Sequence, residues 1–201
     1  MTVNAERVGQ VIRSGGLVWY NAANEKLVSK QIIQAPQRDG MMDNFTHAKV
    51  EFGDNEVLLK SVPGPEGADA VNIKYRDRQA TFADLEAPGY IYSDSFSGCV
   101  FYLFRGPLGY LHAVHAYRGG GRLADPTEYF KARGGKLLYK WDSLGMLTQD
   151  ELMSYQTGAV LACVSRDTID VFAFATKNRE VKRLIDHTAI PGWVASAGLP
   201  V

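Results

Sequence analysis

Two residues in the middle of the chain, Cys99 and His115, have the types and spacing of a nucleophile and its base. The run VFYLFR after Cys99 predicts a buried strand over 100–105. GPLG at 106–109 predicts a turn, and YLHAVHAYRG predicts the returning strand. An imidazole beside a thiol can take its proton, hold the thiolate as an ion pair and so activate the sulfur. This hairpin therefore predicts a Cys–His catalytic pair.

Hairpin geometry favours His115 over His112 as the partner of Cys99. A two-residue turn places Cys99 opposite Ala116, and one further residue in the turn, or a bulge, places it opposite His115. In either register His112 lies about 10 Å farther along the strand, at roughly 3.3 Å per residue. We therefore expect the Cys99 sulfur and the His115 ring to lie within about 3 to 4 Å of each other.

The residues before Cys99 offer further parts of a site. Gly98 permits a tight turn, and backbone N–H groups at Ser97 and Gly98 are candidates to hold an oxyanion. A third group normally orients the imidazole in such a site. The candidates just upstream are Ser93, Asp94, Ser95 and Ser97. The second cysteine, Cys163, lies in the apolar run VLACVS with no histidine nearby, so we interpret it as a core residue.

Composition argues against several other classes of protein. Lys+Arg and Asp+Glu both number 22 in 201 residues, so the basic excess of a nucleic-acid-binding protein is missing. The two cysteines lack metal-ligand spacing, and we expect no metal and no organic cofactor. The chain has no run of 18 apolar residues, and MTVNAERVGQ does not resemble a Sec signal peptide. We therefore expect a soluble protein with no membrane or nucleic-acid partner.

The remaining patterns predict one α+β domain over residues 1–201, with a mostly antiparallel or mixed β-sheet or sandwich core flanked by short helices. Within it, residues 1–36 predict a largely helical segment packed on the core: one helix ends at Gly15-Gly16, and a second begins at Asn24 and ends before Pro36. A short strand at 17–20 separates them. Loops are predicted at 37–44 and 63–70, strands at 47–52, 56–62, 71–75, 90–93, 136–141, 159–165 and 168–176, and further helices after Asp125 and Thr148.

The sequence FSGC at 96–99, followed by a strand, a turn and a histidine late in the next strand, resembles a known signature. It is similar to the Ser-Gly-Cys…His motif of the cysteine-dependent glutamine deamidases: the cytotoxic necrotizing factor catalytic domain, the Burkholderia lethal factor and the chemotaxis receptor deamidase CheD. The family motif usually begins with Leu, where Phe96 stands here. The resemblance covers about 25 of the 201 residues.

This resemblance implies roles for three residues of the chain. Cys99 corresponds to the nucleophile and His115 to the catalytic histidine. Some members have a threonine six residues before the cysteine that supports the histidine, and Ser93 stands at that position here, a hydroxyl but not a threonine. A backbone carbonyl fills the third role in other members.

The resemblance also implies a fold and an activity. The family fold is an α/β sandwich around a mixed sheet, and the activity converts a protein glutamine to glutamate without a cofactor. By analogy the chain is a bacterial effector or toxin, secreted or translocated without a Sec signal, that acts on a host protein such as a small GTPase or translation factor. Two alternatives remain open: other Cys–His acyl chemistry (a peptidase or transglutaminase), and a non-enzymatic binding or immunity module in which Cys99 is merely packed.

Overall fold

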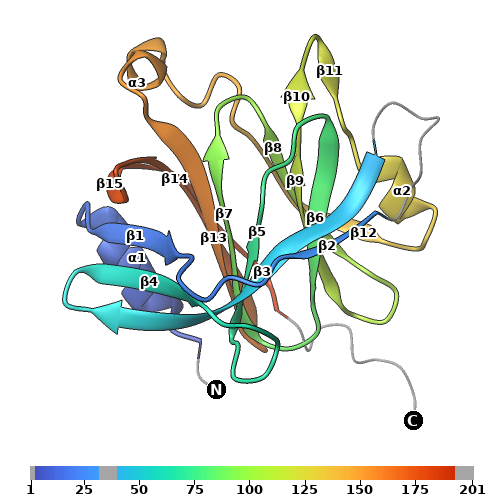
Figure 1. The fold of residues 1–201 in the computed structure, drawn as a ribbon, viewed down its shortest axis with the longest axis horizontal. Helices are drawn as coiled ribbons and strands as arrows, with labels where there is room; N and C mark the ends of the chain where they lie inside the picture. Colours follow the sequence, from blue (N-terminus) through green and yellow to red (C-terminus); the bar gives the residue numbers. More distant parts are fainter. Residues whose placement is uncertain (1–2, 32–39, 193–201) are drawn as a thin grey trace.

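The computed structural model describes residues 3–31 and 40–192, and most of that chain is β-structure (Figure 1). Its three helices are short: α1 (Ala5–Arg13), α2 (Thr127–Lys131) and α3 (Gln149–Met153). The strands are β1 (Leu17–Asn21), β2 (Val28–Gln31), β3 (Gly40–Gly53), β4 (Glu56–Ser61), β5 (Ala70–Ile73), β6 (Gln79–Leu85), β7 (Gly89–Phe96), β8 (Val100–Arg105), β9 (Leu111–Ala116), β10 (Arg118–Gly119), β11 (Arg122–Leu123), β12 (Lys136–Asp142), β13 (Thr157–Val164), β14 (Thr168–Lys177) and β15 (Glu180–Pro191).

Thirteen strands join in one mixed sheet, with the order β12-β8-β9-β6-β3-β4-β1-β15-β14-β13-β7-β5 and with β2 paired to β3. The long strand β3 also pairs with β5, so the pairing path from β3 through β4 to β5 closes on itself. Most pairs are antiparallel, but β1–β4, β3–β6 and β5–β7 are parallel. The chain thus forms a single, mostly β domain with few short helices, as the sequence predicts.

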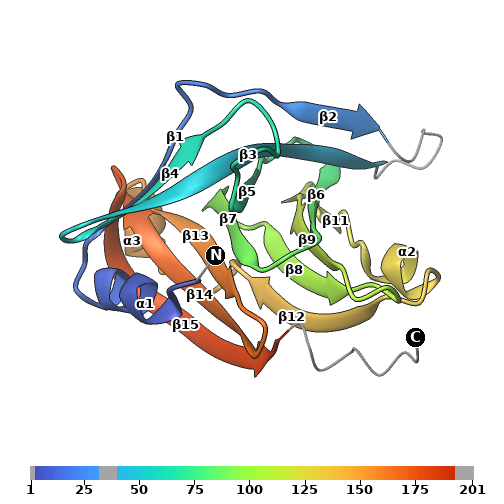
Figure 2. The same ribbon diagram turned by 90° about the horizontal axis from the view of Figure 1, so that it is seen from below.

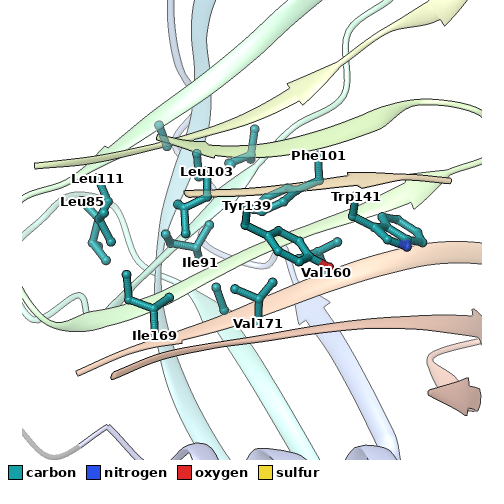
Figure 3. Packing of buried hydrophobic residues seen from close by; sticks show 14 of the residues in the cluster. Leu85, Ile91, Phe101, Leu103, Leu111, Tyr139, Trp141, Val160, Ile169 and Val171 are labelled. Atoms are coloured by element: carbon teal, nitrogen blue, oxygen red, sulfur yellow. The ribbon is translucent and has the colours of Figure 1, made fainter. Parts of the chain in front are cut away.

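The largest hydrophobic core lies between two groups of strands. Side chains of β6, β8, β9 and β12 pack against side chains of β5, β7, β13 and β14. Figure 3 shows Leu85 and Leu111 at one end of this core and Trp141 at the other. Phe101 lies between the two ends, across the core from Val160 of β13 and Val171 of β14. Cys99 belongs to the same core, and its sequence neighbour in the cluster is Phe101, so the thiol lies toward the Trp141 end.

A second core holds α1 against the sheet. Val8, Val11 and Ile12 are buried on one face of this helix and pack among side chains of β4 and β14. Figure 2 shows α1 lying beside β14 and β15. The Asn4 side chain accepts a hydrogen bond from the Arg7 N–H, which caps the helix at its first turn. Burying each aliphatic side chain contributes about 1.5 to 3 kcal/mol, so the helix is stabilised mainly by its apolar face.

The prediction of a largely helical segment over 1–36 is wrong beyond α1. Residues 28–31, expected in a second helix, form strand β2, which pairs antiparallel with β3. The residues expected to end that helix, Ile32 and Pro36, lie outside the described residues. Helical periodicity over so few residues is a weak signal, and pairing with a long neighbouring strand overrides it.

One other expectation about the sheet is wrong, and one strand was not predicted. The predicted loop at 37–44 is strand from Gly40 onward, where β3 pairs with both β2 and β6. Residues 79–85, for which we predicted no element, form β6, the strand that lies next to β9. The helix starts at Thr127 and after Thr148 and the strands around 47–61 and 157–177 agree with the prediction. At Thr148 the capping box with Glu151 is present.

Candidate active site

The hairpin that carries Cys99 and His115 has a register that we did not predict. Phe101 pairs with His115 and Val100 with Ala116. The Gly106 N–H donates to the Tyr110 carbonyl, so residues 107–109 form a three-residue turn. Continuing this register places Cys99 opposite Tyr117, so both predicted pairings are wrong. The extra turn residue moves the cysteine away from His115 instead of toward it.

Cys99 and His115 nevertheless lie on the same face of the hairpin. Cys99 precedes Phe101 by two residues, so the two side chains point to one side of the strand, and His115 is the direct partner of Phe101. Cys99 and His115 are therefore diagonal neighbours, at about 7 to 8 Å between backbone positions. No hydrogen bond joins the Cys99 thiol to either nitrogen of His115. The hydrogen bond expected between the two side chains is thus absent, and their diagonal pairing is the physical reason.

The imidazole of His115 is enclosed by three side chains. Only 1% of the residue surface is exposed. Ser93 Oγ lies 3.0 Å from Nδ1. The ring of Phe96 stacks on the imidazole with centroids 3.9 Å apart, and Tyr75 lies at 5.5 Å on a tilted plane. The histidine is therefore fixed in one orientation by a hydrogen bond and aromatic packing.

A β-bulge explains how Ser93 and Phe96 reach the same ring. Three residues apart on a regular strand, they would point to opposite faces. Between them the pairing of β7 with β13 shifts register, from Ser93 opposite Val160 to Phe96 opposite Gly158. Ser95 lies in this bulge, and its φ of 65° is in the left-handed region. The bulge inverts the alternation, so both side chains face His115.

The hydrogen bonds around Ser93 define the protonation state of each imidazole nitrogen. The Ser93 hydroxyl donates to the carbonyl oxygen of Ile73 at 3.1 Å, on the neighbouring strand β5. A hydroxyl has one proton, and that of Ser93 is used toward Ile73. The Ser93 oxygen therefore accepts a hydrogen bond from His115, whose Nδ1 carries the hydrogen. Nε2 is then the nitrogen with a free lone pair, and it is buried without a hydrogen-bond partner. His115 is thus positioned to accept a proton at Nε2.

Burial decides the charges of the pair at neutral pH. It lowers the pKa of His115 to about 3, so the imidazole is neutral. Burial also raises the pKa of the Cys99 thiol, and the Arg118 backbone N–H and guanidinium only partly oppose it. The expected thiolate–imidazolium ion pair is therefore not the resting state, because both charged forms are disfavoured by desolvation. A neutral thiol and a neutral base remain, which is the arrangement for general-base activation.

The backbone around Cys99 is held by Ser143, a residue that the sequence did not indicate. Its hydroxyl accepts from the Gly98 N–H and donates to the Cys99 carbonyl, both at 2.8 Å. Gly98 has φ of 134°, which requires glycine. The Gly98 N–H is therefore not a free oxyanion donor, contrary to our expectation, and Ser97 is exposed to solvent.

Polar and aromatic side chains surround the thiol on its solvent side. Tyr75 contacts both His115 and Tyr117, and its charge interaction with Cys99 adds to burial in raising the Tyr75 pKa. Arg118 forms an ion pair with Asp142. Among the residues that we did not predict, only Phe96 had a signal in the sequence, because it lies inside the quoted motif. Tyr75, Arg118 and Ser143 are brought to the site by strand order, which the sequence does not reveal.

The other titratable candidates lie elsewhere in the fold. His112 points to the opposite face of the hairpin, where its Nδ1 hydrogen bonds to Asp84 at 2.6 Å. This pair lines a cavity of about 360 Å³, and Phe130 and Arg133 also line it. Cys163 is buried in the second core, where desolvation raises its thiol pKa. None of these groups contacts Cys99 or His115.

Comparison with known proteins gives no relatives: no protein family model, curated protein or solved structure matches the chain. Within residues 3–31 and 40–192, no three His, Cys, Asp or Glu side chains are grouped to hold a metal ion. Over the same residues, no helix is long and apolar enough to cross a membrane.

Proposed function

We propose that the chain is a cysteine-dependent amidohydrolase that converts a glutamine side chain of a target protein to glutamate. One observation carries this proposal: the Ile73 carbonyl and Ser93 hydroxyl hold His115 in the tautomer whose unpaired Nε2 shares a face with the Cys99 thiol. A buried base without a partner is costly, by about 1 to 3 kcal/mol. Such a cost calls for an explanation, and a role in catalysis supplies one.

The proposed reaction uses this pair in two steps. Cys99 Sγ attacks the carboxamide carbon as His115 Nε2 takes the thiol proton, and the C=O electron pair moves to oxygen. The oxyanion collapses, the C–N bond breaks, and the proton on Nε2 leaves with ammonia. Water then attacks the thioester while Nε2 accepts its proton, the C–S bond breaks, and the proton returns to sulfur. The products are glutamate and ammonia, and the free enzyme is restored.

The burial of Cys99 favours a side-chain amide over a peptide bond. Only 6% of the residue surface is exposed, and His115 lies deeper. A single extended side chain can enter such a site with its terminal carboxamide first. A main-chain amide would have to bring two flanking residues with it, which requires an open cleft. The geometry therefore supports a deamidase more than the peptidase alternative.

A segment beside the site supports a protein as the substrate. It runs from residue 144 to 155 and includes α3 (Figure 1). It begins directly after Ser143, whose hydroxyl bonds to the backbone of Gly98 and Cys99. Five of its apolar side chains are exposed: Leu144, Met146, Leu152, Met153 and Tyr155. Arg183 anchors the segment through two hydrogen bonds to Glu151, both 2.9 Å. An anchored apolar surface next to the nucleophile suits contact with a protein partner.

The remaining parts of the proposal come from the resemblance. The packing of two strand groups around one core supports the sandwich architecture of the deamidases. By the same analogy, we propose a soluble bacterial effector or toxin that is exported without a Sec signal and modifies a small GTPase or translation factor. The chemistry written above needs no metal or organic cofactor.

The decisive experiment follows the mass of candidate substrates. Purified small GTPases and translation factors are incubated with the protein, and intact-mass spectrometry measures a gain of about one dalton with release of ammonia. Cys99→Ser and His115→Gln should each abolish the mass change without loss of fold, because they remove the nucleophile and the base. Cys163→Ser is the matched control and should retain activity.

Other products would identify the alternatives. Fragments would indicate peptide hydrolysis, and amine incorporation would indicate transglutamination. Near-normal turnover by a folded Cys99→Ser variant would contradict the nucleophile assignment in every version of the proposal. Efficient turnover of free glutamine would contradict the requirement for a protein substrate, because a free amino acid supplies few remote contacts to orient its amide.

A further inference from the structure

A second buried group without a partner lies on the other side of Cys99. The indole of Trp141 is 3% exposed, and its Nε1–H has no hydrogen-bond partner. Trp141 is on β12 and pairs directly with Phe101, the residue whose other cross-strand partner is His115. Trp141, Phe101 and His115 therefore form a row across three strands on one face.

Cys99 is the diagonal neighbour of both ends of this row. It precedes Phe101 by two residues on the same face, between β12 and β9. Phe96 covers the row and contacts the His115 ring at 3.9 Å and the Trp141 ring at 5.3 Å. The far edge of the indole fits against Gly158, where a Cβ would lie 2.4 Å from Cη2. One edge of the indole is thus packed against Gly158, and the ring lies diagonally across from Cys99.

The two unpaired groups have opposite hydrogen-bonding character. Trp141 Nε1–H is only a donor, and His115 Nε2 is an acceptor in the tautomer set by Ser93. A primary carboxamide offers the matching pair, because its oxygen accepts and its NH₂ donates. Strands two apart lie about 10 Å from each other. Cys99 lies on the strand between them, diagonal to both side chains, so an amide bound at the thiol has the donor on one side and the acceptor on the other.

The proposed reaction also needs an oxyanion donor, and one of the two backbone donors expected for it is already engaged. The Gly98 N–H is already bonded to Ser143 Oγ at 2.8 Å. We infer that the Trp141 indole N–H binds the carboxamide oxygen of the substrate glutamine and stabilises the oxyanion that forms when Cys99 attacks. This inference rests on the proposed function and adds a catalytic residue to it.

The same pairing explains discrimination between substrate and product. Before the attack the carboxamide NH₂ donates to His115 Nε2, and it leaves this lone pair when Nε2 takes the thiol proton. The product carboxylate has no hydrogen to donate at neutral pH. A carboxylate oxygen beside the Nε2 lone pair is repelled, so the product is released. The site thereby selects an amide over an acid of nearly identical shape, as sites with fixed polar groups do.

The test uses butanal, an aldehyde that resembles the end of a glutamine side chain. Addition of the Cys99 thiol to the aldehyde carbon gives a hemithioacetal whose oxygen occupies the oxyanion position. In ¹⁵N-labelled protein, butanal should move the Trp141 indole N–H resonance downfield, and Cys99→Ser should abolish this shift. Replacing Trp141 with benzothienylalanine, which keeps the ring shape but has sulfur instead of N–H, should weaken butanal binding about tenfold or more. Trp19→Phe is the matched control, because Trp19 bonds to Glu56 away from the site.

The outcomes separate this inference from the proposed function. An adduct on Cys99 that leaves the Trp141 resonance unmoved and binds equally to the benzothienyl protein overturns the role of Trp141 alone. Failure of the folded wild-type protein to form any Cys99 adduct overturns both proposals. With a deamidation substrate in hand, the benzothienyl substitution should lower kcat by about 10²- to 10³-fold with little change in KM.

Discussion

The ring of Phe96 lies parallel to the imidazole of His115, with centroids 3.9 Å and planes 8° apart. The contact exists because the bulge at Ser95 turns Phe96 to the same face as Ser93. The Phe96 ring shields one face of the imidazole from water, and the Ser93 hydroxyl forms a hydrogen bond with its Nδ1. In the deamidase motif that FSGC resembles, leucine is usual at the position of Phe96.

Replacing Phe96 with alanine should release His115 from its dry environment. Loss of a buried aromatic side chain should lower the free energy of unfolding by about 3 to 5 kcal/mol. Water entering the cavity stabilises the charged imidazole, so the His115 pKa should rise from about 3 toward its ordinary value. NMR titration of the histidine and chemical denaturation measure the two effects. An unchanged pKa in the folded variant would show that other groups exclude the water.

Local pattern was enough to predict the hairpin with Cys99 and His115, because two apolar runs flanking GPLG indicate adjacent strands. The capping box at Thr148 and the helix ending near Gly15 were predictable for the same reason: each signal is contained within a few residues. The length of the turn between the two strands was not predictable in this way. Whether two or three residues form the loop depends on backbone conformation at Gly109, whose φ is 88°, and this one residue decides the partner of Cys99.

The neighbours that come from distant strands could not be predicted from local pattern. Trp141 reaches the site because β12 pairs with β8. Ser93 reaches it across the core from β7, and it was expected only through the resemblance. Strand order is set by packing of the whole domain, so no local pattern carries it. Protonation states were equally hidden, because burial of His115 and Cys99 depends on that order.

Stability should depend on pH through His115. Its folded-state pKa of about 3 lies below the unfolded value near 6.5, so between these values the unfolded chain binds the extra proton. Stability should therefore fall as pH decreases from about 6.5 toward 3, with a limiting slope of about 1.4 kcal/mol per pH unit, and should level off above 6.5. Denaturation of wild type and His115→Gln measures the difference. Burial also lowers the pKa of His47, but its contribution is common to both proteins and cancels. Parallel curves would contradict a buried neutral histidine.

Alkylation of Cys99 should be slow at neutral pH and should accelerate in alkaline solution. Its thiol pKa is raised by burial, so little thiolate exists near pH 7. Iodoacetamide rates between pH 6 and 10, followed by mass spectrometry in the Cys163→Ser protein, measure this dependence. Fast labelling that is already maximal at pH 7 would mean that the thiolate–imidazolium pair forms after all.

Substrate affinity should depend on the exposed side chains of the 144–155 segment. Met153 and Tyr155 are 73% and 88% exposed, so replacing either with serine should cost little stability. Each change should raise KM for the protein substrate several-fold and leave kcat and Cys99 alkylation unchanged, because the contact is remote from the reacting carbon. Leu108→Ser is the matched control: Leu108 is 74% exposed but lies in the turn at the far end of the hairpin. Equal effects from the control would contradict a specific docking surface.

Ser93 should act as a positioning residue that is sensitive to its hydroxyl. In Ser93→Ala, Nδ1 of His115 loses its acceptor, and the tautomer with the proton on Nε2 gains population. That tautomer cannot accept the thiol proton, so kcat should fall about 10- to 100-fold while KM stays nearly constant. Ser93→Thr keeps the hydroxyl and should restore most of kcat, although the added methyl group in a packed core costs about 1 to 3 kcal/mol of stability. The tautomer can be observed directly from the ¹⁵N chemical shifts of His115. If Ser93→Ala keeps full kcat with the hydrogen still on Nδ1, the orientation of the base depends on aromatic packing alone and not on the hydrogen bond between Ser93 and His115.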